Sequence, residues 1–363
     1  MKPFFSIIVP CCDVEPYVRE CLGSVLDQPF KALECLVVVE TSNDATEAAV
    51  RGIAAKDERV KVFTQPRSGS PAAPRNTALD HADGEYVVFL DGDDVIAEGS
   101  LQRLHDMISA RPGADLYPCA LVACDAALKP LPVQAPTPDV YPQDSPVELS
   151  GPEATILLGK GRNMANPMAQ MTVCRRGFLE ERNLRFVPGL RSEDAEFSPR
   201  ALYCAKRVVP LHLPFYMYRT QRQGSIMTGG SRCSLIGDWA KILNSLMAFH
   251  VAASKDKDFD GRVASAWSRH WLNIVFYSWF FPNQIRKMPK DVRRATLSAL
   301  FADGGGAFRA LRKCAPLPKR VAGLCVEAFV RFPPLRPFID LFFRLYFKLA
   351  DRRSRRAESK GET

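Results

Sequence analysis

Three aspartates lie within four positions directly after an apolar run, and they are the residues best suited to chemistry. Residues 86–90 are apolar without a break, which is typical of a strand buried on both faces of a parallel sheet. Asp91, Asp93 and Asp94 follow, and Gly92 permits a tight turn between them. Carboxylates at this spacing suit Mg²⁺ or Mn²⁺, which keep open positions for substrate phosphates. The alternative is an acidic turn before a helix N-terminus, where the helix dipole favours aspartate.

The elements before this cluster place it at one edge of a sheet. Strands are predicted over residues 5–10, 33–39, 60–63 and 86–90, and helices over residues 15–27, 44–56 and 75–81. This alternation predicts right-handed βαβ units and a parallel, doubly wound sheet, in which ligands collect at the carboxyl ends of the strands. The first strand is not followed by G-x-G-x-x-G, which argues against a dinucleotide-binding dehydrogenase.

The later sequence is less regular. A helix over residues 101–108 and a strand over residues 116–123 precede a proline-rich, irregular stretch at residues 129–148. Beyond it we predict a helix from residue 150, a strand over residues 171–174, a helix opening at residues 191–194, a short strand over residues 207–209 and an aromatic, basic loop over residues 214–227. After residue 230 the pattern changes to helices only, the last over residues 338–350.

The totals describe an ordinary globular protein. Its 363 residues are enough for two domains or for one large domain with an appendage. Of these residues 47% are apolar and 25% are charged, as in most globular proteins. Its 11 cysteines show no C-x-x-C pair or metal-ligand spacing. We therefore expect reduced thiols in a cytosolic compartment, and no signal peptide is visible before the first strand.

Positive charge is concentrated near the C-terminus. Residues 284–363 carry 19 Lys and Arg against 7 Asp and Glu, so their net charge of +12 leaves −3 for residues 1–283. Nucleic acid, anionic lipid and simple solubility are all candidate reasons. Since no apolar run reaches 18 residues, a membrane-spanning helix is not expected. The helix over residues 338–350 suits either packing on the protein or an interfacial position on a membrane, and the basic run at residues 352–356 favours anionic lipid.

Five motifs occur in order over the first two thirds of the chain. They are Ser6-Ile-Ile-Val-Pro10, Tyr17-Val-Arg-Glu-Cys-Leu-Gly-Ser-Val-Leu26, Arg75-Asn-Thr-Ala-Leu79, Gly84-Glu-Tyr-Val-Val-Phe-Leu-Asp-Gly-Asp-Asp94 and Ser192-Glu-Asp194. Together they resemble the family 2 glycosyltransferases of the GT-A type, bacterial enzymes that build capsule, exopolysaccharide and lipopolysaccharide chains. Tyr218-Arg219 and Gly224-Ser225-Ile226 are similar to that family's acceptor-side loop.

The resemblance implies roles for the donor-side residues. Asp91 and Asp93 resemble the family's D-x-D pair, which contacts the ribose and holds Mn²⁺ or Mg²⁺ on the donor pyrophosphate, and Asp94 is assigned to the same metal site. Glu40 falls where the family has an aspartate that reads the uracil edge. The other implied nucleotide-sugar residues are Pro10, Asp13, Arg75, Arg219 and Arg222. For the last two, a solvated basic loop is an equal alternative to closure over the pyrophosphate.

Two acidic residues are implied on the acceptor side. Asp194 resembles the catalytic base, which takes the proton of an acceptor hydroxyl as its oxygen attacks the anomeric carbon. One displacement of this kind inverts the anomeric centre. Glu193 is expected to bind the acceptor or to support the site. Helix capping and the helix dipole would explain both carboxylates without the other motifs.

This sequence departs from the family pattern at the nucleotide pocket. Val39-Glu40-Thr41-Ser42 stands where the family commonly has Asp-Asp-Gly-Ser, and Cys11-Cys12-Asp13 replaces a more usual Val-Tyr-Asn. A non-catalytic nucleotide-sugar-binding protein with a decayed pocket is therefore one alternative. A basic nucleic-acid-binding protein is another, although no recognised nucleic-acid module is present. Because the metal and base residues remain, we favour an active enzyme.

The sequence thus predicts an α/β protein with a GT-A domain over residues 1–230, formed by a doubly wound mixed sheet. Its nucleotide-sugar half would cover residues 1–115 and its acceptor half residues 116–230. Residues 231–363 would form a helical, basic extension that contacts membrane or acceptor. The predicted reaction is inverting transfer of a sugar from a nucleotide-diphosphate sugar, with UDP favoured, to a glycan or lipid-linked glycan in bacterial surface polysaccharide synthesis. The predicted location is cytoplasmic and peripheral on the inner membrane face, with no nucleic-acid partner.

Overall fold

The computed structural model describes residues 2–131, 147–158, 168–220, 232–256, 259–264 and 266–267. The chain divides into two compact units, residues 1–230 and residues 231–363, which are described separately. Arg222, the predicted motif at residues 224–226 and the predicted helix over residues 338–350 lie outside the described residues.

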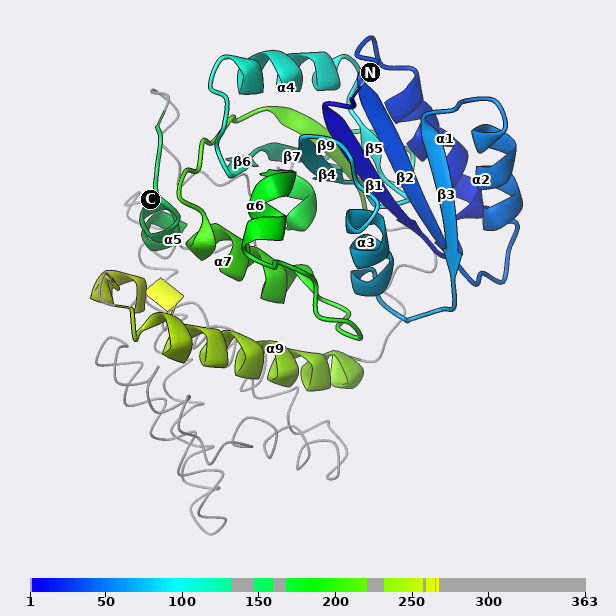
Figure 1. Cartoon of the computed structure of the whole chain (residues 1–363). Helices are drawn as coiled ribbons and strands as arrows, with labels where there is room; N and C mark the ends of the chain where they lie inside the picture. Colours follow the sequence, from blue (N-terminus) through cyan, green and yellow to red (C-terminus); the bar gives the residue numbers. More distant parts are fainter. Residues whose placement is uncertain are drawn as a thin grey trace, which may run out of the picture. The chain divides into compact units, whose positions relative to one another are not determined.

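The first unit is built on a six-stranded mixed sheet (Figure 1). In spatial order its strands are β3 (Val60–Gln65), β2 (Leu33–Glu40), β1 (Phe5–Cys11), β4 (Tyr86–Phe89), β8 (Thr172–Arg175) and β6 (Leu116–Pro118). The first four are parallel, and β8 runs antiparallel to both of its neighbours. The predicted mixed, doubly wound sheet is therefore confirmed, with β1 and β4 side by side at its centre.

Helices cover both faces of this sheet. On one face lie α1 (Glu15–Leu26), α2 (Thr46–Ala54) and α4 (Ser100–Ser109). On the other lie α3 (Ala72–Leu79), α5 (Gly151–Leu158), α6 (Arg176–Glu181) and α7 (Asp194–Cys204). Alternate strand residues supply the two cores: Ile7 packs in the first and Ile8 in the second. Because both faces are covered, every residue of β2 is buried.

A second, three-stranded sheet has the order β5 (Val95–Ile96), β9 (Pro214–Arg219), β7 (Ala120–Cys124). β9 runs antiparallel to β5 and parallel to β7. This corrects the prediction of a loop from residue 214, since two segments distant in sequence pair with residues 214–219. The short strand predicted over residues 207–209 is also absent among the described strands, where Val208 makes only isolated bridges to Leu116 and Leu149.

The described part of the second unit is dominated by α9 (Arg232–Ala253). Ile242, Leu246 and His250 are buried, four residues apart, so one face of the helix is covered. The His250 ring packs edge-on against Phe259 and Trp267, and burial lowers its pKa to about 4. Among the described residues, no helix combines the length and apolar character needed to cross a membrane.

Candidate active site

The acidic turn lies where the sequence predicted it, at the carboxyl end of β4. Leu90 still bonds to the β1 backbone, through its N–H and the Ile8 carbonyl, and the turn begins at the next residue. Gly92 suits this turn because a Cβ would make tight contacts, 3.0 Å from the Cys11 sulfur and 3.1 Å from the Pro10 carbonyl oxygen. Pro10 therefore borders the turn through its backbone.

The Asp91 carboxylate is held at both oxygens. Oδ1 accepts from Arg75 Nη2 at 2.6 Å, and Oδ2 accepts from Gln170 Nε2 at 2.6 Å. The side chain keeps 23% exposure, so it remains open to a ligand. Gln170 belongs to a short 3-10 helix (Ala169–Met171) that leads into β8. No motif or spacing in the sequence indicated Gln170, because its contact with Asp91 depends on how β8 pairs with β4.

Arg75 is fully buried and connects two acidic segments. One guanidinium nitrogen binds Asp91 and another binds Glu193. The charged group also lies 5.7 Å from the Phe89 ring centre and 5.3 Å from that of Phe186. This placement differs from the predicted direct contact with the nucleotide, because the guanidinium has no exposed surface. Arg75 instead fixes the distance between the acidic turn and the start of α7.

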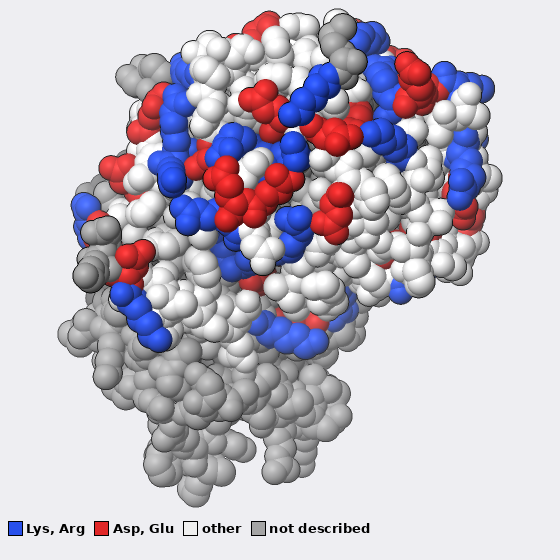
Figure 2. All heavy atoms as spheres, viewed as in Figure 1, with Lys and Arg blue, Asp and Glu red and all other residues white. Residues whose placement is uncertain are grey.

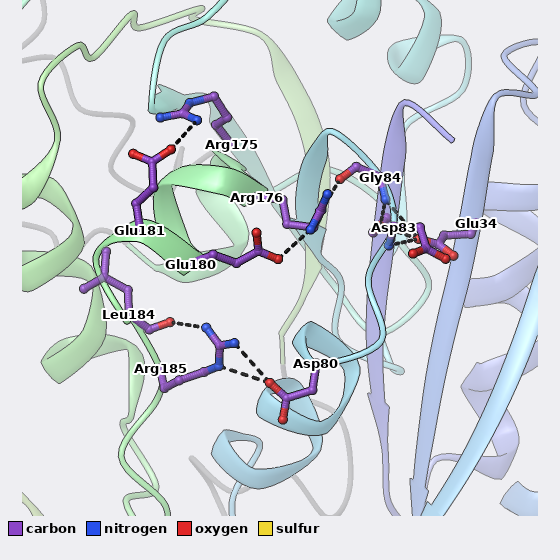
Figure 3. A network of polar contacts seen from close by, with 11 residues as sticks. Glu34, Asp80, Asp83, Gly84, Arg175, Arg176, Glu180, Glu181, Leu184 and Arg185 are labelled. Atoms are coloured by element: carbon purple, nitrogen blue, oxygen red, sulfur yellow. Dashed lines mark hydrogen bonds and ion pairs between the residues drawn. The ribbon is translucent and has the colours of Figure 1, made fainter. Parts of the chain in front are cut away.

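A polar network anchors the segment that carries Phe186 (Figure 3). Arg176, at the start of α6, donates from Nε to the Gly84 carbonyl at 2.8 Å. Arg185 donates from Nη2 to Asp80 Oδ1 at 3.0 Å. The Phe186 N–H bonds to the Asn76 side chain at 2.9 Å. The first bond attaches α6 to the loop before β4, and the other two attach the residues after α6 to α3, which carries Arg75, and to its C-cap. They therefore hold the Phe186 ring against the guanidinium.

The surface around this network mixes both signs of charge. Figure 2 shows basic and acidic side chains next to one another on the viewed face of the first unit. The ion pairs of the network include Arg175 with Glu181 and Arg185 with Asp80. Their acidic partners are 60% exposed, so each pair contributes at most about 1 kcal/mol to stability.

Glu193 and Asp194 lie at the N-terminus of α7, where the helix dipole favours carboxylates. Burial raises the pKa of Glu193 to about 8; Arg75 lowers it, and the charge of Asp194 raises it further. Burial also raises the pKa of Asp194, against the lowering effects of Arg75 and of the Ala195 N–H, which donates to Oδ1 at 2.8 Å. One guanidinium thus faces three carboxyl groups, those of Glu193, Asp194 and Asp91. Such a cluster favours retention of a proton near neutral pH.

Asp94 is not placed as a metal ligand. Its side chain is buried, Oδ2 accepts from the Tyr216 hydroxyl at 2.5 Å, and Oδ1 accepts from the Arg219 N–H at 2.7 Å. Burial and the charges of Asp93 and Asp91 raise its pKa well above the ordinary value. The predicted metal role of Asp94 is therefore corrected to a structural one. Sequence reasoning missed Tyr216 because its strand was predicted to be a loop.

Glu40 and Asp13, which were predicted to contact the nucleotide, lie at the end of β2 and shortly after β1. Glu40 is buried at the end of β2, and its Oε1 accepts from Gln65 Nε2 at 3.1 Å and from the Ser68 N–H at 3.0 Å. Asp13 has a positive φ of 52°, a conformation that aspartate tolerates better than most residues. Its carboxylate accepts from the Asn43 N–H at 2.7 Å. The loops after β1, β2 and β3 therefore meet at one edge of the sheet.

The residues fit a divalent cation that arrives with a phosphate ligand. Across the described ranges, no three His, Cys, Asp or Glu side chains are grouped so as to hold a metal ion alone. Asp91 and Asp93 remain as two carboxylates on one turn. Mg²⁺ and Mn²⁺ commonly take one or two carboxylates and complete their coordination with substrate phosphates and water. The donor set therefore suits a shared site and not an all-protein metal cage.

Comparisons with known proteins place much of this chain among glycosyltransferases. Residues 6–182 match the model of Glycosyl transferase family 2. The uncharacterized glycosyltransferase EpsJ of Bacillus subtilis is 31% identical over 222 residues, 60% of this chain and 62% of that protein. A GalNAc(5)-diNAcBac-PP-undecaprenol beta-1,3-glucosyltransferase of Campylobacter jejuni is 29% identical over 270 residues, 72% of this chain and 80% of that protein. The chain spans less than two thirds of the length of several curated relatives, EpsJ included.

The fold has a close counterpart among solved structures. The crystal structure of Staphylococcus aureus TarS 1-349 in complex with UDP-GlcNAc matches with a TM-score of 0.73 at 21% identity, covering 95% of this chain and 92% of that one. The structural match supports the GT-A fold, and the family match covers the acidic turn. Residues 6–182 therefore form a domain of glycosyl transferase family 2, with the GT-A fold that the motifs predicted.

Proposed function

We propose that this protein is an inverting glycosyltransferase that moves a sugar from a nucleotide-diphosphate sugar to a hydroxyl group of a glycan or lipid-linked glycan. The observation that carries the proposal is the Asp91–Arg75–Glu193 connection. It holds the acidic turn, which suits the donor diphosphate, beside Asp194, which suits a base. Structural capping alone would not require a fully buried arginine between these two segments.

The chemistry follows from these positions. A divalent cation on Asp91 and Asp93 would offset the charge that develops on the nucleoside diphosphate as it leaves. Asp194 would accept the proton of the acceptor hydroxyl while that oxygen bonds to the anomeric carbon and the bond to the diphosphate breaks. Arg75 would keep Asp91 and Glu193 at a fixed separation through the reaction. A single displacement gives the opposite anomeric configuration in the product.

The proposed donor is a uridine nucleotide sugar, whose base is uracil. Glu40 offers a carboxylate at the end of β2, and its Oε1 is fixed by Gln65 and Ser68. A fixed acceptor suits the N–H edge of uracil. Support also comes from the TarS neighbour, which was crystallised with UDP-GlcNAc, and from the Campylobacter relative, whose name specifies an undecaprenol-linked acceptor. Bacterial surface polysaccharide synthesis, including capsule or lipopolysaccharide, is the proposed context.

Donor turnover tests the proposal. The purified chain would be incubated with Mn²⁺ or Mg²⁺ and UDP-, GDP- and dTDP-sugars, with and without a lipid-linked glycan, and nucleotide release would be measured. Asp93→Asn should lose metal-dependent nucleotide binding, whereas Asp194→Asn should bind the donor and lose transfer. Asp106→Asn, on the exposed side of α4, is the matched control and should remain active. Nucleotide-sugar binding without turnover on any acceptor would favour the non-catalytic alternative.

Membrane contact through residues 231–363 is part of the proposal and has its own test. The net charge of +12 over residues 284–363 supports attraction to anionic lipid, at about 1 kcal/mol for each basic residue near the surface. Replacing the arginines of residues 352–356 by glutamine should weaken sedimentation with anionic vesicles and leave neutral vesicles unaffected. Equal binding by both proteins would refute this contact. A salt-dependent gel shift on DNA or RNA would instead revive the nucleic-acid alternative.

A further inference from the structure

The turn of residues 91–94 is held by β9 at several points. The Asp94 carboxylate accepts from the Tyr216 hydroxyl and from the Arg219 backbone N–H, at 2.5 and 2.7 Å. The Asp91 N–H donates to the Tyr216 hydroxyl oxygen at 3.3 Å. Within the turn, the Asp94 N–H donates to the Asp91 carbonyl at 3.0 Å. β9, which comes much later in the sequence, therefore holds the backbone of the turn that forms the candidate metal site.

The Arg219 side chain adds a contact at the central residue of the turn. Its Nε donates to the Asp93 carbonyl at 2.8 Å. Nη2 binds Glu20 Oε2 at 2.6 Å, and Nη1 binds the Ala126 carbonyl. The Tyr17 ring covers the guanidinium, with its centre 5.0 Å from Cζ. Each of the three nitrogens has a protein acceptor, and the side chain is only 4% exposed.

We infer that Arg219 is a positioning residue: it holds the Asp93 backbone so that the Asp93 carboxylate points at the metal and diphosphate, and it does not contact the nucleotide itself. This inference rests on the proposed function, because it takes Asp93 as a metal residue. It replaces the sequence-based role of Arg219 at the pyrophosphate, which would require the guanidinium to leave its protein partners. Glu20 becomes a second participant, because it holds the far end of the guanidinium.

The expected effect is on metal-dependent binding. Groups that orient a metal ligand without touching the metal typically change metal affinity by about 10- to 100-fold when they are mutated. Loss of the Arg219 side chain frees the Asp93 carbonyl and leaves the Asp94 contacts from the backbone and Tyr216 in place. The turn should therefore survive, but with a less fixed Asp93. Nucleoside recognition near Glu40 does not pass through these bonds.

Calorimetry on the full chain separates a positioning role from a direct one. Binding of UDP would be measured with Mn²⁺ and with EDTA, and binding of uridine would be measured with EDTA, for wild type, Arg219→Gln and Glu20→Gln. Arg219→Gln should weaken UDP binding about 10- to 100-fold with Mn²⁺ and leave both EDTA measurements unchanged. Glu20→Gln should produce a smaller loss with Mn²⁺, about two- to fivefold, as expected for one partly exposed ion pair.

Three results would overturn the inference. An equal loss of UDP affinity with Mn²⁺ and with EDTA, with uridine unaffected, would show a direct pyrophosphate contact. No loss in either condition would show that Arg219 has no role in binding. A loss matched by Arg175→Lys, which alters a comparable Arg–Asp pair at Asp115, would show a general effect of stability. Because Glu20 is 56% exposed, Glu20→Gln provides the test if Arg219→Gln does not fold.

UDP binding by the wild type tests the proposed function independently of the positioning role of Arg219. If wild-type UDP binding does not depend on Mn²⁺, the proposed metal-dependent function fails. If wild-type binding depends on Mn²⁺ and Arg219→Gln binds equally well, only the positioning role fails.

Discussion

Replacing Arg75 by methionine tests the buried ionic cluster most directly. The side chain has no exposed surface, and it pairs with Asp91 at 2.6 Å and with Glu193. Breaking a buried pair by removing one partner costs about 3–5 kcal/mol, because a charge is left uncompensated. The lost contacts with the rings of Phe89 and Phe186 add about 1–2 kcal/mol. Methionine is close enough in size that cavity formation should contribute little.

The loss of folding stability in Arg75→Met should depend on pH, and Glu193 sets the direction of this dependence. Its pKa is raised from 4.5 to about 8 in the folded protein. Protonation of Glu193 therefore stabilises the fold fully below pH 4.5, and this contribution is lost as pH rises through about 8. Without Arg75, which lowers this pKa, the ionised form becomes costlier still. We expect Arg75→Met to lose about 4–7 kcal/mol at pH 8.5 and clearly less at pH 5.5.

The assay must report the first unit alone. All four tryptophans lie beyond residue 230, so their fluorescence cannot follow it. Cys21 and Cys35 are buried in the core of the first unit. Their exposure in urea can be measured by labelling with a disulfide reagent active at both pH values, followed by mass spectrometry of each peptide. The midpoint and slope of labelling then give the free energy of unfolding.

Two further variants make the result decisive. Arg75→Met combined with Glu193→Gln should recover part of the stability at pH 8.5, because one unpaired charge is removed. Arg185→Met removes a surface pair with Asp80 and should cost less than about 1 kcal/mol at either pH. The reasoning is refuted if Arg75→Met resembles Arg185→Met at pH 8.5, or if its loss is the same at both pH values.

Three other predictions concern the site and its support. Wild-type transfer should fall as pH falls through the raised pKa of Asp194, and the slow residual transfer of Asp194→Asn should lack this acidic limb; an unchanged pH–rate profile would exclude Asp194 as the base. Gln65→Leu should weaken binding of UDP and of uridine about 5- to 10-fold, measured by calorimetry, because it releases Glu40 Oε1; unchanged affinity would argue that Glu40 does not recognise the base. Gly84→Ala should destabilise the first unit by about 3 kcal/mol or more, since its Cβ would lie 2.5 Å from the Ser6 nitrogen beside the Glu34 network of Figure 3; normal urea stability would contradict this.

Local sequence signals were sufficient for the donor half of the fold. The unbroken apolar runs of β1, β2 and β4 indicated buried parallel strands, and the confirmed order of elements placed Asp91 at a carboxyl end. The strands and the turn depend on periodicity and turn chemistry within about ten residues, which a sequence displays directly. Glu193 and Asp194, at the start of a helix, were singled out only through the resemblance of Ser192-Glu-Asp194 to a family motif.

The acceptor side was predicted less well because its structure depends on long-range pairing. β9 was expected to be a loop, and it is a strand because β5 and β7, which lie far from it in sequence, pair with it. α6 has only six residues, too few for a periodic pattern to stand out. Gln170 carried no signal at all, since nothing about a glutamine before a strand indicates a carboxylate partner.

The sequence by itself determined the doubly wound sheet and the acidic turn after β4, and its resemblance to a known family singled out the candidate metal and base residues. Only the tertiary structure decided what each charge does. Asp94 contacts Tyr216 across 122 positions, and Arg75 contacts Glu193 across 118. Burial of those contacts turned a predicted metal ligand into a structural anchor and a predicted nucleotide contact into a link between two acidic segments. The physical reason is that solvation and pairing of a charged side chain depend on neighbours that folding, and not sequence proximity, brings to it.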